Sequence, residues 1–210
     1  MKVKLDTLHL LDRLSADLSG LRAAHIPSTG WLQLVRRSLG KPLDAVAKEA
    51  KVSRQAIFAF ESREAAGTLP IGRLAYLAQL LGCQMQYGLY STDPAVLQRL
   101  AEVAQKKSPR NFKEDKEPVF PDYMQNSGMP PRGWLKRTRL SLGITQVDLA
   151  KKIGLTRQSL INLEKSEVVG LISLRNLRKI AQAMGYDLVY FLVNDPKVAP
   201  SFVERFKTEK

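Results

Sequence analysis

The sequence has little of what disulfides, metal sites and catalytic centres need. Its 210 residues include one cysteine, Cys83, and two histidines, His9 and His25. One cysteine excludes an internal disulfide and a thiolate metal cluster within one chain, and the histidines lack metal-ligand spacing. The chain has neither a Gly-Lys-Ser/Thr phosphate loop nor a nucleophile elbow. We therefore expect no enzymatic activity, no metal and no cofactor, with Cys83 as a small core residue.

Long apolar runs and negative charge are also scarce. No stretch approaches the ~20 apolar residues that span a bilayer, and charges interrupt the N-terminal MKVKLDTLHLLDRLSADL, where a signal peptide needs an apolar region. Lysine and arginine outnumber aspartate and glutamate 33 to 20, which gives a net charge of +13. We expect a cytoplasmic protein with a polyanionic partner, nucleic acid first and an anionic membrane surface second.

Two segments of the chain repeat each other. Residues 30–89 (repeat 1) align without a gap with residues 133–192 (repeat 2) at a constant offset of 103, with 20 identities in 60 positions. GWLQLVRRSLG faces GWLKRTRLSLG, and AKEAKVSRQAIFAFE faces AKKIGLTRQSLINLE. A gapless match of this density indicates duplicated domains.

Each repeat predicts the same mostly α plan: a first helix, two short helices around a turn, a longer helix, and a short β-strand. Gly82 and Gly185 follow the longer helices and can supply the left-handed residue that closes them. After Gly82, apolar and polar residues alternate with period two, as in a strand with one covered face. Residues 188–193 are apolar on both faces, so the other repeat or a second subunit should cover that strand on both sides.

The sequence therefore divides into five parts. Two tandem helix-turn-helix domains, each with its strand, are expected at 30–90 and 133–195. The other parts are an N-terminal amphipathic helical arm at 1–29, a helix plus proline-rich linker at 91–132, and a basic tail at 196–210. The first domain carries 8 basic and 4 acidic residues and the second 10 and 5, so much of the positive charge follows the repeats.

The stretch from Thr145 to Glu164, TQVDLAKKIGLTRQSLINLE, predicts two short helices joined by a sharp turn at Gly154. Threonines precede both helices, where their side chains can cap them. The outer face of the second helix carries Arg157, Gln158, Ile161 and Asn162. Arginine can grip guanine with two donors, glutamine or asparagine can do the same to adenine, and isoleucine can touch a thymine methyl. These side chains suit major-groove reading, and Gln146 is placed to hold a phosphate.

This stretch resembles the XRE-type, lambda-repressor-like helix-turn-helix family, since TQxDLAxxxGLTRQSLxxLE has the family's Gln, Leu-Ala, turn glycine, capping threonine, recognition glutamine and terminal glutamate. The resemblance implies that Arg157, Gln158 and Asn162 contact bases and that Gln146 contacts a phosphate. It also implies partly buried ion pairs between the first helix and the recognition helix, Arg139 with Glu164 and Arg36 with Glu61. The other expected DNA contacts are Ile161, Thr156, Ser159, Lys165, Ser53, Arg54, Gln55 and Arg63.

Repeat 1 keeps Ser-Arg-Gln at 53–55 but departs from this pattern at three positions. Lys51 replaces the turn glycine, Leu43 replaces the phosphate-binding glutamine, and Ala59 replaces Asn162. A lysine at positive φ is uncommon, so we expect a strained or altered turn. Three interpretations stay open for repeat 1: weaker DNA binding, a different sequence preference, or a mainly structural role.

A narrower resemblance is to the mobile mystery protein A group, through GWLxxxRxxLG, LAxxxGLTxQS, LEKSE and YDLVYFLV. Those regulators are usually described with one such domain and often lie beside a Fic-domain gene. We expect a sequence-specific double-stranded DNA-binding transcriptional regulator, a repressor associated with the bacterial nucleoid when bound, with one recognition helix per repeat and no membrane partner.

Two other readings compete with a free-standing repressor. The first is an antitoxin that neutralises a neighbouring toxin, for example of the Fic type, and autoregulates its operon. Phe120, Tyr123 and the tail are the segments that would reach such a toxin. The second is an interaction scaffold that does not bind DNA. The tandem can supply both half-site readers in one chain, whereas a homodimer through the C-terminal strands would present four.

Overall fold

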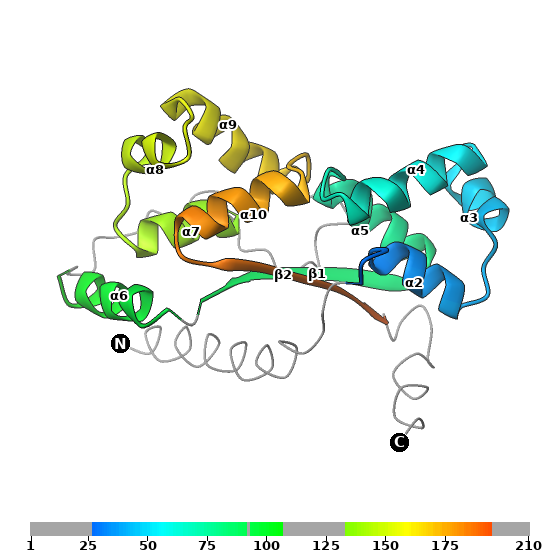
Figure 1. Ribbon diagram of the computed structural model, residues 1–210, viewed down its shortest axis with the longest axis horizontal. Helices are drawn as coiled ribbons and strands as arrows, with labels where there is room; N and C mark the ends of the chain where they lie inside the picture. The colour runs from blue at the N-terminus through cyan, green and yellow to red at the C-terminus, as the bar shows by residue number, and fades with distance from the viewer. Residues whose placement is uncertain (1–26, 92, 107–132, 195–210) are drawn as a thin grey trace, which may run out of the picture.

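The structure is a computed structural model that describes residues 27–91, 93–106 and 133–194 (Figure 1). The expected N-terminal helix, the proline-rich linker with Phe120 and Tyr123, and the basic tail lie outside these residues. Within the described part, no helix is both long and apolar enough to cross a membrane.

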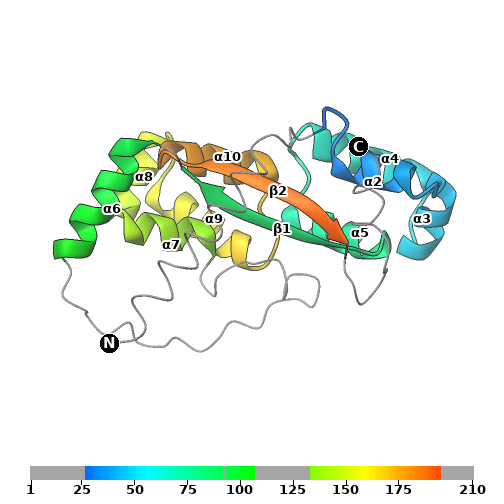
Figure 2. The same ribbon diagram turned by 90° about the horizontal axis from the view of Figure 1, so that it is seen from below.

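The described part of the chain is mostly helical, and its helices occur in the same order in both repeats. Repeat 1 contains α2 (Trp31–Ser38), α3 (Leu43–Ala50), α4 (Arg54–Ala65) and α5 (Ile71–Leu80). Repeat 2 contains α7 (Trp134–Ser141), α8 (Gln146–Lys152), α9 (Arg157–Val168) and α10 (Leu174–Ala183). The helices of repeat 1 form one cluster and those of repeat 2 another, side by side over opposite ends of a central ribbon (Figures 1 and 2).

The central ribbon consists of β1 (Cys83–Tyr90) and β2 (Asp187–Asn194), which pair in antiparallel fashion. Alternate residues of both strands are buried, among them Cys83, Met85, Leu188 and Leu192. The expected burial of β2 on both faces is only partly right, because Val189, Phe191 and Val193 on its other face are half-buried. Strand pairing between the repeats thus occurs within a single chain.

The contacts between the repeats are related by an approximate two-fold axis. Tyr87 lies opposite Tyr190 in the ribbon, and Pro70 forms an isolated bridge with Ser173; in both pairs the two residues are 103 positions apart. Hydrogen bonds flank the second pair symmetrically, from Ile71 N to Ile172 O at 2.9 Å and from Leu174 N to Leu69 O at 3.3 Å. Because 103 is also the offset of the repeats, each central residue meets its own counterpart.

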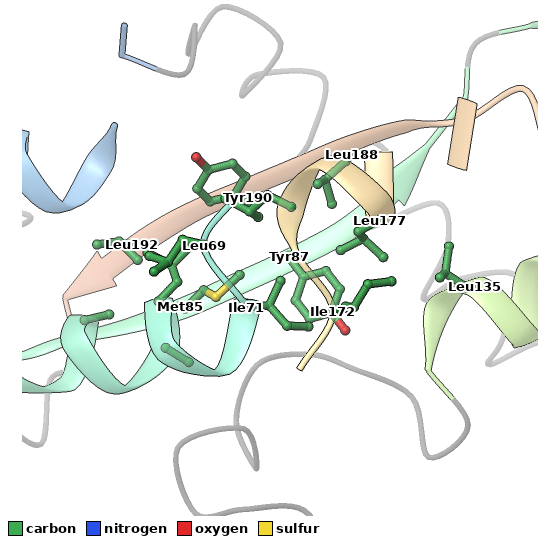
Figure 3. Close-up of a cluster of buried hydrophobic side chains, with 14 of the residues drawn as sticks. Leu69, Ile71, Met85, Tyr87, Leu135, Ile172, Leu177, Leu188, Tyr190 and Leu192 are labelled. Atoms are coloured by element: carbon green, nitrogen blue, oxygen red, sulfur yellow. The ribbon is translucent and has the colours of Figure 1, made fainter. Parts of the chain in front are cut away.

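One apolar core runs through this junction (Figure 3). Leu74 and Leu174 are fully buried. Ile71 of α5 and Leu177 of α10, also buried, face the ribbon in Figure 3. Burying one such side chain stabilises a fold by about 1.5 to 3 kcal/mol. The two clusters of helices are therefore held together by the same type of packing that forms each of them.

Two buried glutamates connect the core to the helices of both repeats. Glu64 of α4 accepts hydrogen bonds from Trp31 N and Leu32 N at 2.9 Å each, and from the Tyr190 hydroxyl at 3.4 Å. Glu167 of α9 does the same in repeat 2, with the Tyr87 hydroxyl at 3.2 Å. Burial raises the pKa of both carboxyl groups from 4.5 to about 7, although the N–H and hydroxyl donors oppose that shift.

Helix α6 (Pro94–Lys106) packs beside repeat 2 (Figure 1). The Arg99 Nε donates to the carbonyl oxygen of Leu142 at 3.1 Å, which satisfies a backbone acceptor at the end of α7. Val96 fits against Gly185, where an added Cβ would lie 2.6 Å from the valine side chain. Helix α6 therefore distinguishes one end of the molecule from the other.

Candidate nucleic-acid interface

Helices α8 and α9 form a tight helix-turn-helix unit. The Thr145 hydroxyl caps α8 by accepting from Asp148 N at 3.1 Å, and the Thr156 hydroxyl caps α9 by accepting from Ser159 N at 3.1 Å. Between them Gly154 has a φ of 70°, which favours glycine. These local features match the sequence prediction and fix how α9 leaves the turn.

The expected base-reading side chains lie at the start and middle of α9. Arg157, Gln158 and Asn162 are exposed, whereas Ile161 is half-buried. The Gln158 Nε2 donates to Asn162 Oδ1 at 3.1 Å, so the two amides are oriented relative to each other. Ser159 is half-buried, and its hydroxyl lies 2.8 Å from that of Thr156. The exposed group offers the donors and acceptors that purine edges require.

Gln146 links the reading helix to the interior. Its Nε2 donates to Glu164 Oε2 at 3.2 Å, and its Oε1 accepts from Arg157 Nε at 3.4 Å. In this geometry the Gln146 side chain does not simply point into solvent: it connects Arg157 to the buried Glu164 and so helps to position the arginine. The phosphate contact expected for Gln146 stays a prediction.

The ion pairs anticipated from the family resemblance lie beneath α4 and α9. The Arg139 Nε lies 2.7 Å from Glu164 Oε1, with side chains 6% and 5% exposed, and Arg139 Nη1 donates to Ile144 O at 3.1 Å. The Arg36 Nε lies 2.6 Å from Glu61 Oε1 in repeat 1. Each pair ties the first helix of its repeat to the helix that carries the reading residues.

Helices α3 and α4 of repeat 1 have a similar arrangement with different chemistry. Ser53 caps α4 by accepting from Ala56 N at 3.1 Å. Lys51 occupies the turn with a φ of 54° and a ψ of 42°, the left-handed conformation that Gly154 adopts in repeat 2, so the turn keeps its shape with the strain expected for a lysine there. Leu43 cannot form the hydrogen bonds of Gln146. Instead Arg54 Nε lies 4.0 Å from Asp44 Oδ1, with both side chains more than half exposed.

Two apolar residues on α4 and α8 are exposed, although the sequence analysis did not single them out. Phe58 on α4 is 57% exposed and Val147 on α8 is 58% exposed. Phe58 aligns with Ile161, which the sequence analysis placed on the outer face of its helix. The alignment of the two repeats therefore indicated that Phe58 faces outward as well. Val147 aligns with the polar Asp44, so the alignment of the repeats did not indicate an exposed apolar residue there.

The remaining expected contacts are basic residues nearer the C-terminal ends of the two helices. Lys165 on α9 is exposed. Arg63 on α4 is also exposed, and its Nη2 reaches Thr68 O at 3.5 Å. Within the described residues, no group of three or more histidine, cysteine, aspartate or glutamate side chains is arranged to hold a metal ion.

Helices α4 and α9 share one side of the molecule. Figure 1 shows α3–α4 and α8–α9 at the two upper outer corners, while the ribbon runs along the opposite side. In the view from below, the ribbon is in front of both helix clusters (Figure 2). The strongest candidate for a binding surface is therefore the face that carries α4 and α9.

Comparison with known proteins agrees with this geometry for repeat 2. Residues 135–191 match the helix-turn-helix family model HTH_3. No curated protein and no solved structure matches the chain. The family match supports a DNA-binding transcriptional regulator of the XRE type, a class that is generally not enzymatic.

Proposed function

We propose that the chain is a transcriptional repressor that binds one double-stranded operator with both repeats. Helix α9 enters the major groove of one half-site, and α4 acts as the recognition helix of a second helix-turn-helix unit. The observation that carries the proposal is the approximate two-fold relation of the repeats, which pairs Tyr87 with Tyr190 and Pro70 with Ser173. A two-fold arrangement of recognition helices is what an operator with inverted half-sites requires.

The reading side chains support two related but unequal half-sites. Both helices begin with an exposed Arg-Gln pair, 54–55 and 157–158, which suits a guanine next to an adenine. Asn162 continues the polar surface on α9, whereas Ala59 interrupts it on α4. The operator is therefore an imperfect inverted repeat, and the chain represses by occupying it in the path of RNA polymerase.

Selection of bound sequences from random duplexes by the full chain tests this proposal. The expected outcome is a single motif with two inverted, non-identical halves. A mass measurement of the purified complex should then find one chain per duplex. A motif with one half-site would limit reading to repeat 2, and two chains per duplex would favour a homodimer with four readers. Failure to enrich any sequence would refute the function.

Point variants of the full chain provide the control. Arg54→Ala and Arg157→Ala should each relax base preference in a different half of the selected motif. Separate repeats are unsuitable for this comparison, because cutting the chain would separate β1 from β2 and leave each strand with an unpaired edge.

A further inference from the structure

Phe58 is an exposed aromatic ring on α4, on the same face as the polar Arg54 and Gln55. It is 57% exposed, whereas the neighbouring Ile57 is 2% exposed and packs in the core. Leaving a large apolar side chain in water forgoes the favourable free energy that its burial would give. Single exposed apolar residues are common, and Leu171 is 70% exposed, so the position of Phe58 on α4 has to carry the argument.

The position of Phe58 places it in the reading surface of α4. It follows Arg54 by four residues and Gln55 by three, the spacings at which helical side chains share one face. The equivalent residue in repeat 2, Ile161, is smaller and half-buried. The two recognition helices therefore present different apolar groups beside the same Arg-Gln pair.

The residue after Phe58 increases this difference. In repeat 2, Asn162 accepts a hydrogen bond from Gln158 at 3.1 Å and adds polar groups to the reading face. In repeat 1 its place is taken by Ala59, which offers only a methyl group. The centre of the α4 surface is consequently apolar, while the corresponding part of α9 is polar.

The thymine C5 methyl is the apolar group that base edges display in the major groove, where other positions offer hydrogen-bond donors and acceptors. We infer that Phe58 determines specificity by packing against a thymine methyl in the half-site read by α4. This inference rests on the proposed function, because it requires α4 to enter the groove.

Replacement of thymine by deoxyuridine tests the contact, since it removes the methyl and keeps the base pair. The operator is first selected with the full chain, and the half-site whose preference is relaxed by Arg54→Ala is assigned to α4. Each thymine there is then replaced in turn. One replacement should weaken wild-type binding about fourfold, the factor that corresponds to the ~0.8 kcal/mol of burying one methyl-sized group.

Variants of Phe58 identify the residue that senses the methyl. Phe58→Ala should bind the thymine and deoxyuridine duplexes equally, while Phe58→Leu should keep part of the difference. Ile161→Ala is the matched control and should leave deoxyuridine sensitivity in the α4 half-site unchanged. Because Phe58 is exposed, its variants should melt at the wild-type temperature.

Three outcomes would overturn the inference while leaving specific DNA binding intact. They are an α4 half-site without thymine, a wild-type chain indifferent to every deoxyuridine there, and a Phe58→Ala chain that keeps the full penalty. Loss of all sequence selectivity in the wild-type chain would instead refute the proposed function itself.

Discussion

The Tyr87 hydroxyl donates to Glu167 Oε1 at 3.2 Å, although the two residues belong to different repeats. The same carboxylate holds the amides of Trp134 and Leu135 at the start of α7, and it belongs to α9. A single side chain thus joins α9, the first helix of its own repeat and the strand of the other. Displacing the Glu167 side chain should therefore disturb α9, α7 and β1 together.

The pH dependence of stability should report the two buried carboxyl groups. Burial raises the pKa of Glu64 and Glu167 from 4.5 to about 7, so the folded chain binds more protons than the unfolded chain between these values. This contribution to the free energy of unfolding is fully present below pH 4.5 and is lost as the pH rises through 7. Urea unfolding at stepped pH measures it.

A double variant isolates this contribution. Glu64→Gln with Glu167→Gln removes both titrating groups and should flatten the dependence in that window, whereas Glu49→Gln at an exposed site should keep it. An unchanged slope in the double variant would assign the dependence to other groups.

The glycine before each first helix should be required for stability, both because of its left-handed backbone and because a side chain would collide with the buried glutamate. Gly30 has a φ of +80°, and an added Cβ would lie 2.6 Å from Glu64 Oε2. Gly40 has a φ of +64° but has nothing within 4 Å of an added Cβ. Gly40→Ala should therefore cost only the left-handed strain of about 1 to 2 kcal/mol. Gly30→Ala should cost more in thermal unfolding, and equal losses would show that the carboxylate moves aside freely.

Removing one partner of a buried ion pair should be severe. Arg139→Met leaves the Glu164 carboxylate buried without its arginine, and the expected loss of stability is about 3 to 5 kcal/mol. The Lys41–Glu49 pair is the control, because its side chains are 33% and 45% exposed. Glu49→Ala should cost about 1 kcal/mol or less in denaturant unfolding. A similarly small loss for Arg139→Met would mean that water reaches Glu164.

Arg157 should contribute to sequence preference. Arg157→Ala is expected to weaken binding to the selected operator by about 1 to 3 kcal/mol and to relax the preference at one base pair. Titration of the variant against all four base pairs at that position measures both effects. An equal loss on every sequence would reduce Arg157 to a phosphate contact.

Salt dependence should separate Lys165 from Arg157. The logarithm of the binding constant should fall with the logarithm of salt concentration, with a slope of about −0.9 for each phosphate neutralised. Lys165→Ala should weaken binding to every sequence alike and make the slope shallower by about one. A salt-independent affinity would contradict an electrostatic role for the basic side chains.

Local features of the fold could be predicted because they depend on neighbouring residues. The caps Thr145 and Thr156 follow from residue type and position in the repeat, whereas the left-handed Lys51 follows from its alignment with Gly154 and goes against its residue type. The pairing of β1 with β2 could not be assigned between the other repeat and a second subunit, because strand patterns do not name their partners. The hydrogen bond from Gln146 to Glu164 could not be predicted either, since it depends on the packing of α8 against α9.

The sequence analysis also did not predict that Glu64 and Glu167 are buried and bind the backbone amides at the start of α2 and α7. Each was visible as an identity between the repeats, three residues after the glutamate assigned to an ion pair. Sequence alone does not show that this second glutamate faces the first turn of another helix. Its pairing with a tyrosine of the opposite repeat depends on the two-fold arrangement, which only the three-dimensional structure contains.

Under the proposed function, the placement of α6 gives the complex with DNA a direction. A symmetric homodimer looks the same to factors approaching from upstream and downstream, but in this chain α6 accompanies repeat 2 alone within the described residues. If the two half-sites differ, the protein can load onto its operator in only one orientation. Inverting the operator within a promoter would then present the opposite flank to polymerase without changing affinity.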